Sequence, residues 1–205
     1  MDALAWIEAN IAPLRFAAGA ATVFVWVAYL QLFLTSLRRQ RRTQIMINRG
    51  VGVGLDARCL IANLGHEPIY VIEIIGRIET DGDAHEAVVT DRADLRDDEL
   101  NDPSEAAHQG PVKSGEGYDA GSFGDMIEKV RRSAGLDHEP PLSRVALTVV
   151  AATAAKGQPV AATRGYVVAD GKAGPVLRPE GLQARQIRSI RARRRLRRRL
   201  QRDLD

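Results

Sequence analysis

Few side chains in this 205-residue chain are of a type and spacing that could carry out chemistry. None of the four histidines stands at ligand spacing from another histidine or from the single cysteine, so the pattern does not predict a zinc site. The fragment DGDAHE at 81–86 offers oxygen atoms to a cation, but Asp-Gly is typical of a turn between strands. The glycines at 50–54 match neither of the phosphate-binding patterns G-x-G-x-x-G and G-x-x-x-x-G-K-S/T. We therefore expect no catalytic residue, no cofactor and no metal ion, and we do not expect an enzyme.

The strongest chemical signal is cationic. Residues 185–205 hold ten arginines, two aspartates and no lysine. The segment 179–205 is rich in helix formers, and Leu182, Leu196 and Leu200 lie on one side of a helical projection. The pattern predicts a basic amphipathic helix. Its contact candidates are the ten arginines, namely Arg185, Arg188, Arg191, Arg193, Arg194, Arg195, Arg197, Arg198, Arg199 and Arg202.

Three kinds of partner suit such a tail. Acidic protein surfaces, anionic lipid headgroups and nucleic-acid phosphates all attract arginine. No aromatic residue interleaves the tail to stack on bases, which disfavours specific recognition of single-stranded nucleic acid. The acidic body of the chain, and a solvated end without any partner, are the remaining interpretations.

An uncharged run would anchor these groups at a membrane. Residues 16–37 carry no formal charge, and at about 1.5 Å per residue such a helix covers about 33 Å, close to a hydrocarbon core of about 30 Å. Arginines rather than a small-residue cleavage site follow it, which disfavours a removable signal peptide. We expect one transmembrane helix at 15–37, and before it a short amphipathic outer segment at 1–14 in which Pro13 marks the turn into the membrane.

The span has its own contact candidates and a preferred orientation. Ala17 and Ala21 stand at the spacing that lets two helices approach closely, and Gln31 is a polar residue that would prefer a partner helix to lipid. The segment 38–42 holds four arginines and reads as a stop-transfer sequence. This asymmetry predicts an outer N-terminus and a cytoplasmic C-terminal domain in a bacterial inner membrane.

The body, residues 43–178, has the period of β-strands. Its apolar, β-branched stretches are short and separated by turn residues, which indicates an antiparallel arrangement. Strands are expected at 43–49, 56–64, 68–80, 86–92, 144–152 and 159–170, with a further one within 111–121. One helix is expected at 122–135, capped by Ser122 with Asp125 three residues on. The pattern predicts a mainly-β soluble domain, an immunoglobulin-like sandwich with one short helix.

Several details of the body refine this prediction. Alternation places Tyr70, Ile72, Ile74 and Ile78 on one face of their strand. The connection NLGHEPIYV, which begins at residue 63, resembles inter-strand turns of bacterial immunoglobulin-like domains; the resemblance implies a fold and no function.

Charge and cysteine content bear on the surroundings of the body. Residues 43–181 carry fourteen basic and twenty-two acidic side chains, and the segment 91–108 reads as a long acidic loop. Cys59 is the only cysteine, so we expect a buried thiol and a reducing compartment.

These observations together favour an interaction protein. The hypothesis is a single-pass inner-membrane accessory or scaffold protein that docks its cytoplasmic β domain and basic tail onto a larger complex of membrane protein subunits. The alternative is a membrane tether that binds nucleic acid or anionic lipid through the tail.

Overall fold

The structure, a computed structural model, describes residues 11–40, 43–80, 82–90, 109–136, 140–154, 156–171, 174–189, 191–192, 194–196 and 198. The expected outer segment up to residue 10 and the acidic loop at 91–108 lie outside these residues. The chain forms two compact units, Met1–Arg42 and Thr43–Asp205. The second unit therefore includes the arginine-rich segment, which the strand pattern alone did not assign to the body.

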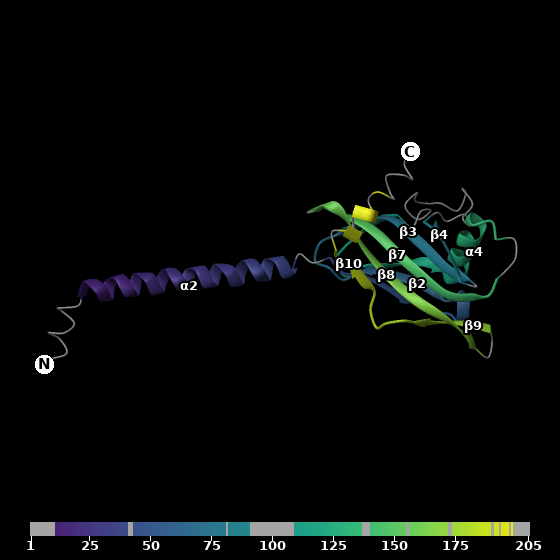
Figure 1. The fold of residues 1–205 in the computed structure, drawn as a ribbon, viewed down its shortest axis with the longest axis horizontal. Coiled ribbons are helices and arrows are strands. Elements are labelled where there is room, and N and C mark those ends of the chain that lie inside the picture. The colour runs from purple at the N-terminus through teal and green to yellow at the C-terminus, as the bar shows by residue number, and fades with distance from the viewer. Residues whose placement is uncertain are drawn as a thin grey trace. The chain divides into compact units, whose positions relative to one another are not determined.

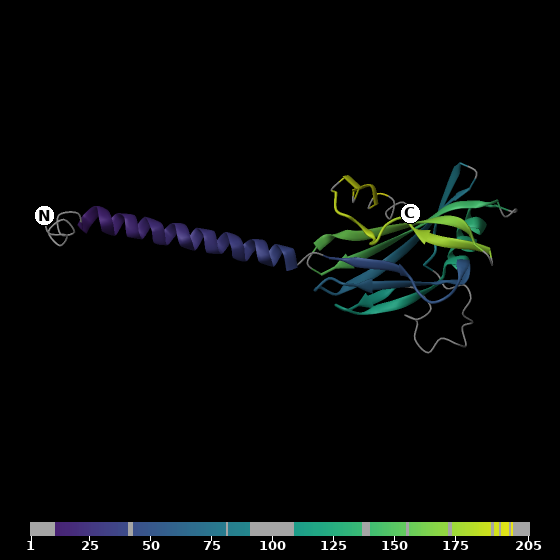
Figure 2. The ribbon, with the colours of Figure 1, turned by 90° about the horizontal axis from the view of Figure 1, so that it is seen from below.

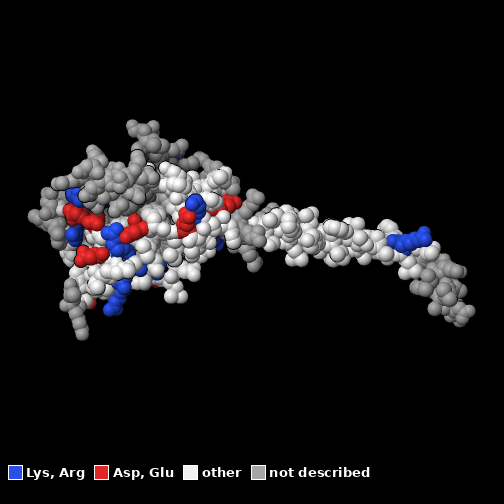
Figure 3. Space-filling model, turned by 180° about the vertical axis from the view of Figure 1, so that it is seen from behind, with Lys and Arg blue, Asp and Glu red and all other residues white. Residues whose placement is uncertain are grey.

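The first unit contains one long apolar helix, α2 (Ile11–Gln40). Every residue from Ile11 to Ser36 is exposed, and the part Ile11–Leu37 is long and apolar enough to cross a membrane. On the part of its surface that Figure 3 colours, the only charge is one basic side chain near its beginning. At about 1.5 Å per residue the helix measures about 45 Å, the thickness of a bilayer with its headgroup regions.

The helix begins earlier than the charge pattern suggests. Residues 11–14 continue directly into the span, so Pro13 does not mark a turn. Proline is tolerated in the first turn of a helix because the N–H groups there have no acceptor within the helix. At the other end, residues 38–40 of the basic segment are still helical.

The second unit is a mostly-β domain of two antiparallel sheets (Figure 1). The small sheet has the order β1-β2-β6, with the strands β1 (Ile45–Arg49), β2 (Arg58–Asn63) and β6 (Gly117–Ser122). The large sheet has the order β10-β8-β7-β3-β4, with β5 also paired to β3 and β9 also paired to β8. Its strands are β3 (Ile69–Thr80), β4 (Asp83–Val88), β5 (Gly110–Val112), β7 (Leu142–Thr153), β8 (Lys156–Gly171), β9 (Gly174–Pro179) and β10 (Arg185–Ile187).

The two sheets pack face to face around one hydrophobic core (Figure 2). Apolar side chains that alternate along each strand fill the space between the layers, as in other stacked sheets. Tyr166 and Phe123 lie at its centre with ring centroids 4.9 Å apart in an edge-to-face arrangement. The lone thiol, Cys59, is fully buried in this core, as the sequence predicts.

The helix α4 (Phe123–Ser133) closes one end of the core and confirms the expected helix. Ser122 is its N-cap: the Asp125 amide donates to the Ser122 hydroxyl over 3.0 Å, and that hydroxyl bonds the Asp125 carboxylate. The buried face of the helix reaches Gly76 of β3, where an added Cβ would lie 2.8 Å from the Val130 side chain. Glycine at this position therefore lets the helix approach the sheet.

The expected alternation along β3 is only half right. Ile74 and Ile78 are buried in the core, but Tyr70 is exposed and Val71 takes the inward position in its place. The register with β7 shifts between Val71 and Glu73, a β-bulge. Because side chains alternate with period two, one extra residue moves the preceding side chains to the opposite face.

The C-terminal half of the pattern needs two corrections. The segment 111–121 forms two strands in different sheets, β5 and β6, rather than one. The helix expected over 179–205 is wrong at Arg185–Ile187, which form β10 beside β8. Residues 179–184, 188 and 189 are not helical either, and among the residues described after them only 191–192, 194–196 and 198 are helical. The other residues of the predicted amphipathic helix lie outside the described part of the chain.

The N-cap of α4 gives a stability prediction. Ser122→Ala removes the acceptor of the Asp125 amide, so we expect the free energy of unfolding to fall by about 1 kcal/mol. Ser122→Thr keeps the hydroxyl and should stay close to the wild type. Urea unfolding of the full-length protein in detergent, followed by pulse proteolysis, measures both variants. Equal losses in Ser122→Ala and Ser122→Thr would show that the cap does not contribute.

Candidate functional site

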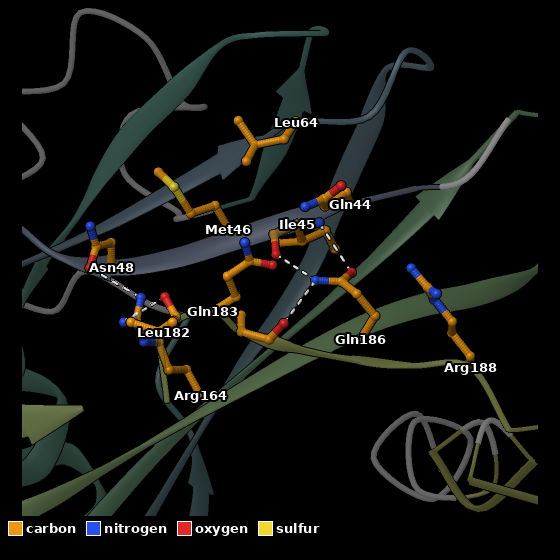
Figure 4. Close-up of a pocket in the computed structure, with 11 residues that line it drawn as sticks. Gln44, Ile45, Met46, Asn48, Leu64, Arg164, Leu182, Gln183, Gln186 and Arg188 are labelled. Carbon is orange, nitrogen blue, oxygen red and sulfur yellow. Dashed lines mark hydrogen bonds between the residues drawn. The ribbon is translucent and has the colours of Figure 1, made fainter. Parts of the chain in front are cut away.

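The arginine-rich segment is fixed to the domain at the free edge of β1. Strand β1 pairs with β2 on one side only, so its other side presents unpaired backbone groups. The Gln186 side chain satisfies both groups of Ile45: the Ile45 amide donates to Oε1 over 3.1 Å, and Nε2 donates to the Ile45 carbonyl over 2.7 Å. Figure 4 shows the side-chain amide of Gln186 facing the backbone of Ile45. A side-chain amide thus takes the place of a neighbouring strand.

Arg164 extends this connection along the same edge. Its side chain is 8% exposed, and one terminal nitrogen donates to the Ile47 carbonyl over 2.6 Å and to the Asn48 side chain over 3.1 Å. The other terminal nitrogen reaches the carbonyls of Gly181 and Leu182 at 3.2 and 3.4 Å. The guanidinium therefore ties β1 to the loop that leads into β10.

A cavity of about 340 Å³ opens between β1 and this loop (Figure 4). The described residues that line it are Gln44, Ile45, Met46, Asn48, Leu64, Arg164, Leu182, Gln183, Ala184, Gln186 and Arg188. Amides, two guanidinium groups and apolar side chains make up this lining, and it contains neither a carboxylate nor a nucleophile. Such a surface can bind polar or anionic groups but offers no acid–base pair.

The segment after β10 crosses the outer face of the large sheet. Ile75, Val150 and Ala161 form a small buried cluster on this face, and Ile187 and Leu196 pack against it. Figure 2 shows the C-terminal segment on the side of the large sheet that faces away from the small sheet. The side chains of Ile187 and Leu196 are therefore directed toward the domain.

The arginines of the same segment project into solvent. Of the ten contact candidates, six are described and all six are exposed: Arg185, Arg188, Arg191, Arg194, Arg195 and Arg198. Within the described part of the chain, none of these six forms an ion pair with a carboxylate. The other four, Arg193, Arg197, Arg199 and Arg202, lie outside it. We call the six exposed residues the arginine surface.

Several other charged side chains among the described residues of the domain form ion pairs. Arg58 pairs with Asp119 at 2.6 Å, and Arg144 lies between Glu180 at 2.6 Å and Glu79 at 3.4 Å. The hydrogen bond to Glu180 raises the pKa of Arg144, and both carboxylates add to the effect. Figure 3 shows acidic and basic side chains lying against one another on one face. The uncompensated arginine surface is thus a local property.

The candidates in the span keep the positions that the sequence gives them. Ala17 and Ala21 are exposed one turn apart on the same side of α2, and Gln31 is exposed further along it. The backbone carbonyl of Gln31 accepts a hydrogen bond from the Thr35 hydroxyl over 2.7 Å. Their contact with another helix stays a prediction.

The glycines at 50–54 and Gly82, which belong to the two segments considered for ligand binding, lie in turns between strands. Gly52 and Gly54 adopt φ of 118° and 64°, which favour glycine in a turn, and Gly82 does so between β3 and β4. No group of three or more metal-ligating side chains occurs in the part of the chain that is described. Sequence reasoning missed Arg164 and Gln186. A signal exists for Arg164, since Ala162, Arg164 and Tyr166 alternate inward along an apolar strand.

The clamp between Gln186 and Ile45 predicts a local change in hydrogen exchange. Gln186→Ala removes the acceptor of the Ile45 amide, so we expect that amide to exchange about tenfold faster, as loss of a hydrogen bond worth about 1.4 kcal/mol implies. Gln183→Ala is the matched control, because Gln183 lines the same cavity from an exposed position. Unchanged exchange at Ile45 in Gln186→Ala would contradict the clamp.

Two buried acids, Cys59 and Tyr166, and the half-buried Tyr118 predict a loss of stability at high pH. Burial, with a smaller effect of Asp119 and an opposing effect of Arg164, raises the pKa of Cys59 from 9.0 to about 12. Burial also raises the pKa of Tyr118 and Tyr166 above 10.0. The folded state therefore holds these protons more tightly than the unfolded state, and the stability present below pH 9 is lost as the pH rises toward 12.

Cys59→Ala separates the thiol from the tyrosines. Between pH 9 and 10 ionisation of the thiol in the unfolded state by itself lowers the stability by about 1 kcal/mol, and the variant should lose this contribution while the smaller one of each tyrosine remains. Urea unfolding of the full-length protein, read by a subtilisin pulse at each pH, gives the slope of stability against pH. An identical slope in both proteins would exclude Cys59 as its source.

In comparisons with known proteins, no family model, no curated protein and no solved structure matches the chain.

Proposed function

We propose that this protein is a single-pass membrane accessory protein that docks its β domain and arginine surface onto a larger membrane assembly. Helix α2 supplies the anchor in this proposal, with Ala17, Ala21 and Gln31 directed toward neighbouring helices. The basic residues after the span favour a cytoplasmic domain, an outer N-terminus and a bacterial inner membrane. An immunoglobulin-like strand arrangement also stays a prediction for the two-sheet body.

The observation that carries the proposal is the arginine surface itself. The domain compensates many of its other charges in ion pairs, yet it holds six exposed guanidinium groups on one short segment without a carboxylate among the described residues. Like charges gathered in this way repel one another, so the arrangement does not stabilise the fold. A binding partner with negative charge would relieve that repulsion.

The same observation supports a second candidate, a membrane tether for a polyanion. Phosphates of nucleic acid attract arginine by release of counterions, with no need for base recognition. The tail has no aromatic residue to stack on bases, so such binding would be independent of sequence.

Purification from the native membrane tests the proposed function. We expect the full-length protein, extracted in mild detergent at low salt, to retain a defined set of membrane subunits at constant stoichiometry, identified by mass spectrometry. Exchange of the six exposed arginines for glutamine should weaken that retention. Recovery of the protein alone would contradict the accessory role, and nuclease-sensitive absorbance at 260 nm would favour the polyanion tether.

A further inference from the structure

We propose that the arginine surface, together with the exposed side chain of Leu182, binds the anionic phospholipid headgroups of the bilayer that α2 spans. The inference rests on the proposed membrane placement of α2 and names the partner of one surface. Three observations bear on the inference. They are the short chain connection to the anchor, the fit of arginine to phosphate groups, and the direction of the apolar side chains, which differs from that of a helix that binds in a groove.

The chain between the anchor and the first strand of the domain is short. Ile45 follows the last residue of α2, Gln40, by five residues, which span at most about 18 Å of chain. The Gln186 side chain is bonded to the backbone of this same Ile45, and Arg188 lines one cavity with Gln44. The arginine surface therefore begins at the point where the chain passes from the anchor into the domain.

The exposed groups match an anionic headgroup layer. Arg185, Arg188, Arg191 and Arg194 recur every three residues and all are exposed. A planar guanidinium binds phosphate oxygens with two parallel hydrogen bonds, which a lysine ammonium cannot do. A surface built of arginine alone is thus suited to phosphate as well as to negative charge in general.

Leu182 favours a bilayer over nucleic acid. Its side chain is 98% exposed, although it lies in the loop that Arg164 holds in place, and it lines the same cavity as Arg188. An exposed apolar side chain on the same domain as these cations can enter the boundary between headgroups and acyl chains. Nucleic acid offers no comparable apolar region to such a residue.

The direction of the remaining apolar side chains disfavours a helix-binding groove on a partner protein. A helix that docks in a groove presents a stripe of apolar anchors to its partner. Here Ile187 and Leu196 already pack on Ile75, Val150 and Ala161 of the chain's own large sheet. The part of the segment that is described therefore presents charge, and not its apolar side, to a partner.

Lipid retention by the full-length protein tests this inference. The protein in dodecyl maltoside is mixed with equal amounts of phosphatidylglycerol and phosphatidylcholine and repurified at low salt, and bound lipids are counted by mass spectrometry. We expect a clear preference for phosphatidylglycerol. Each arginine near an anionic surface is worth about fivefold in affinity, so Arg185, Arg188, Arg191 and Arg194 exchanged for glutamine should lower the preference at least about tenfold.

A matched variant controls for net charge. Arg77, Lys113, Arg132 and Arg178 are exposed cations on other elements, and their exchange for glutamine removes the same charge. This variant should keep the lipid preference. The basic residues next to the span are unchanged in both variants, so they cannot cause a difference between them. Cys59 must remain unreactive to maleimide in each variant, because the buried thiol reports that the domain is folded.

Leu182→Gln separates a bilayer from other anions. We expect this variant to lose part of its retention of phosphatidylglycerol while its retention of heparin, a soluble polyanion, stays unchanged. Equal lipid preference in the wild type and the four-arginine variant would overturn the inference, as would binding of nucleic acid in place of lipid. The recovery of membrane subunits by the wild type tests the proposed function separately, since it is measured without an arginine exchange and does not depend on the lipid count.

Discussion

The free edge of β1 is the constraint on which the arrangement of the domain depends. A strand with one unpaired side carries N–H and C=O groups that need partners, and leaving a buried group unsatisfied costs about 1–3 kcal/mol. The structure satisfies this edge with the side chains of Gln186 and Arg164 instead of a further strand. Gln186 lies 141 residues along the chain from Ile45. The last part of the domain is therefore required by its first strand.

This requirement explains the contrast between the arginines of the chain. Arg164 is buried, and its charge is balanced by backbone carbonyls and one side-chain amide, so it acts as a structural donor. Arg144 lies in an ion-pair network on the surface. Arg185 and Arg188 flank the clamp residue and have neither role. Within the described residues their side chains form neither hydrogen bonds nor ion pairs, so the contacts seen in the fold do not explain them, and the interaction with another molecule stays our proposal.

Local sequence patterns predicted much of the fold but not this connection. Strands β1, β2, β3, β7 and β8 follow from β-branched runs, and α4 follows from its cap and apolar stripe, because these signals lie within a few residues of one another. The bulge in β3 was not predictable, since no glycine or proline marks it and only pairing with β7 fixes it. The span was predicted by composition, although its first turn begins at Ile11 rather than after Pro13.

The prediction of a helix over Arg185–Ile187 failed for a tertiary reason. Arginine and leucine favour a helix in isolation, but three residues beside β8 gain ladder hydrogen bonds and allow Gln186 to reach β1. Local propensity amounts to a few tenths of a kcal/mol per residue and is outweighed by such contacts. Long-range pairing of this kind leaves no mark in a window of a dozen residues. The same holds for Gln186 as a functional residue, which looks like any polar position in a basic tail.

The change from strand to helix within the segment decides which side chains are displayed. In β10 the period of two turns Gln186 toward β1 and sends Ile187 to the outer face of the large sheet. In the helical residues that follow, Ala192 and Leu196 stand four residues apart and are the half-buried positions. Gln186, Ile187 and Leu196 thus connect the segment to the domain, while the described arginines fill exposed positions between them. Release of the segment would uncover Ile75, Val150 and Ala161, so the burial of these apolar side chains favours the docked arrangement of the described residues.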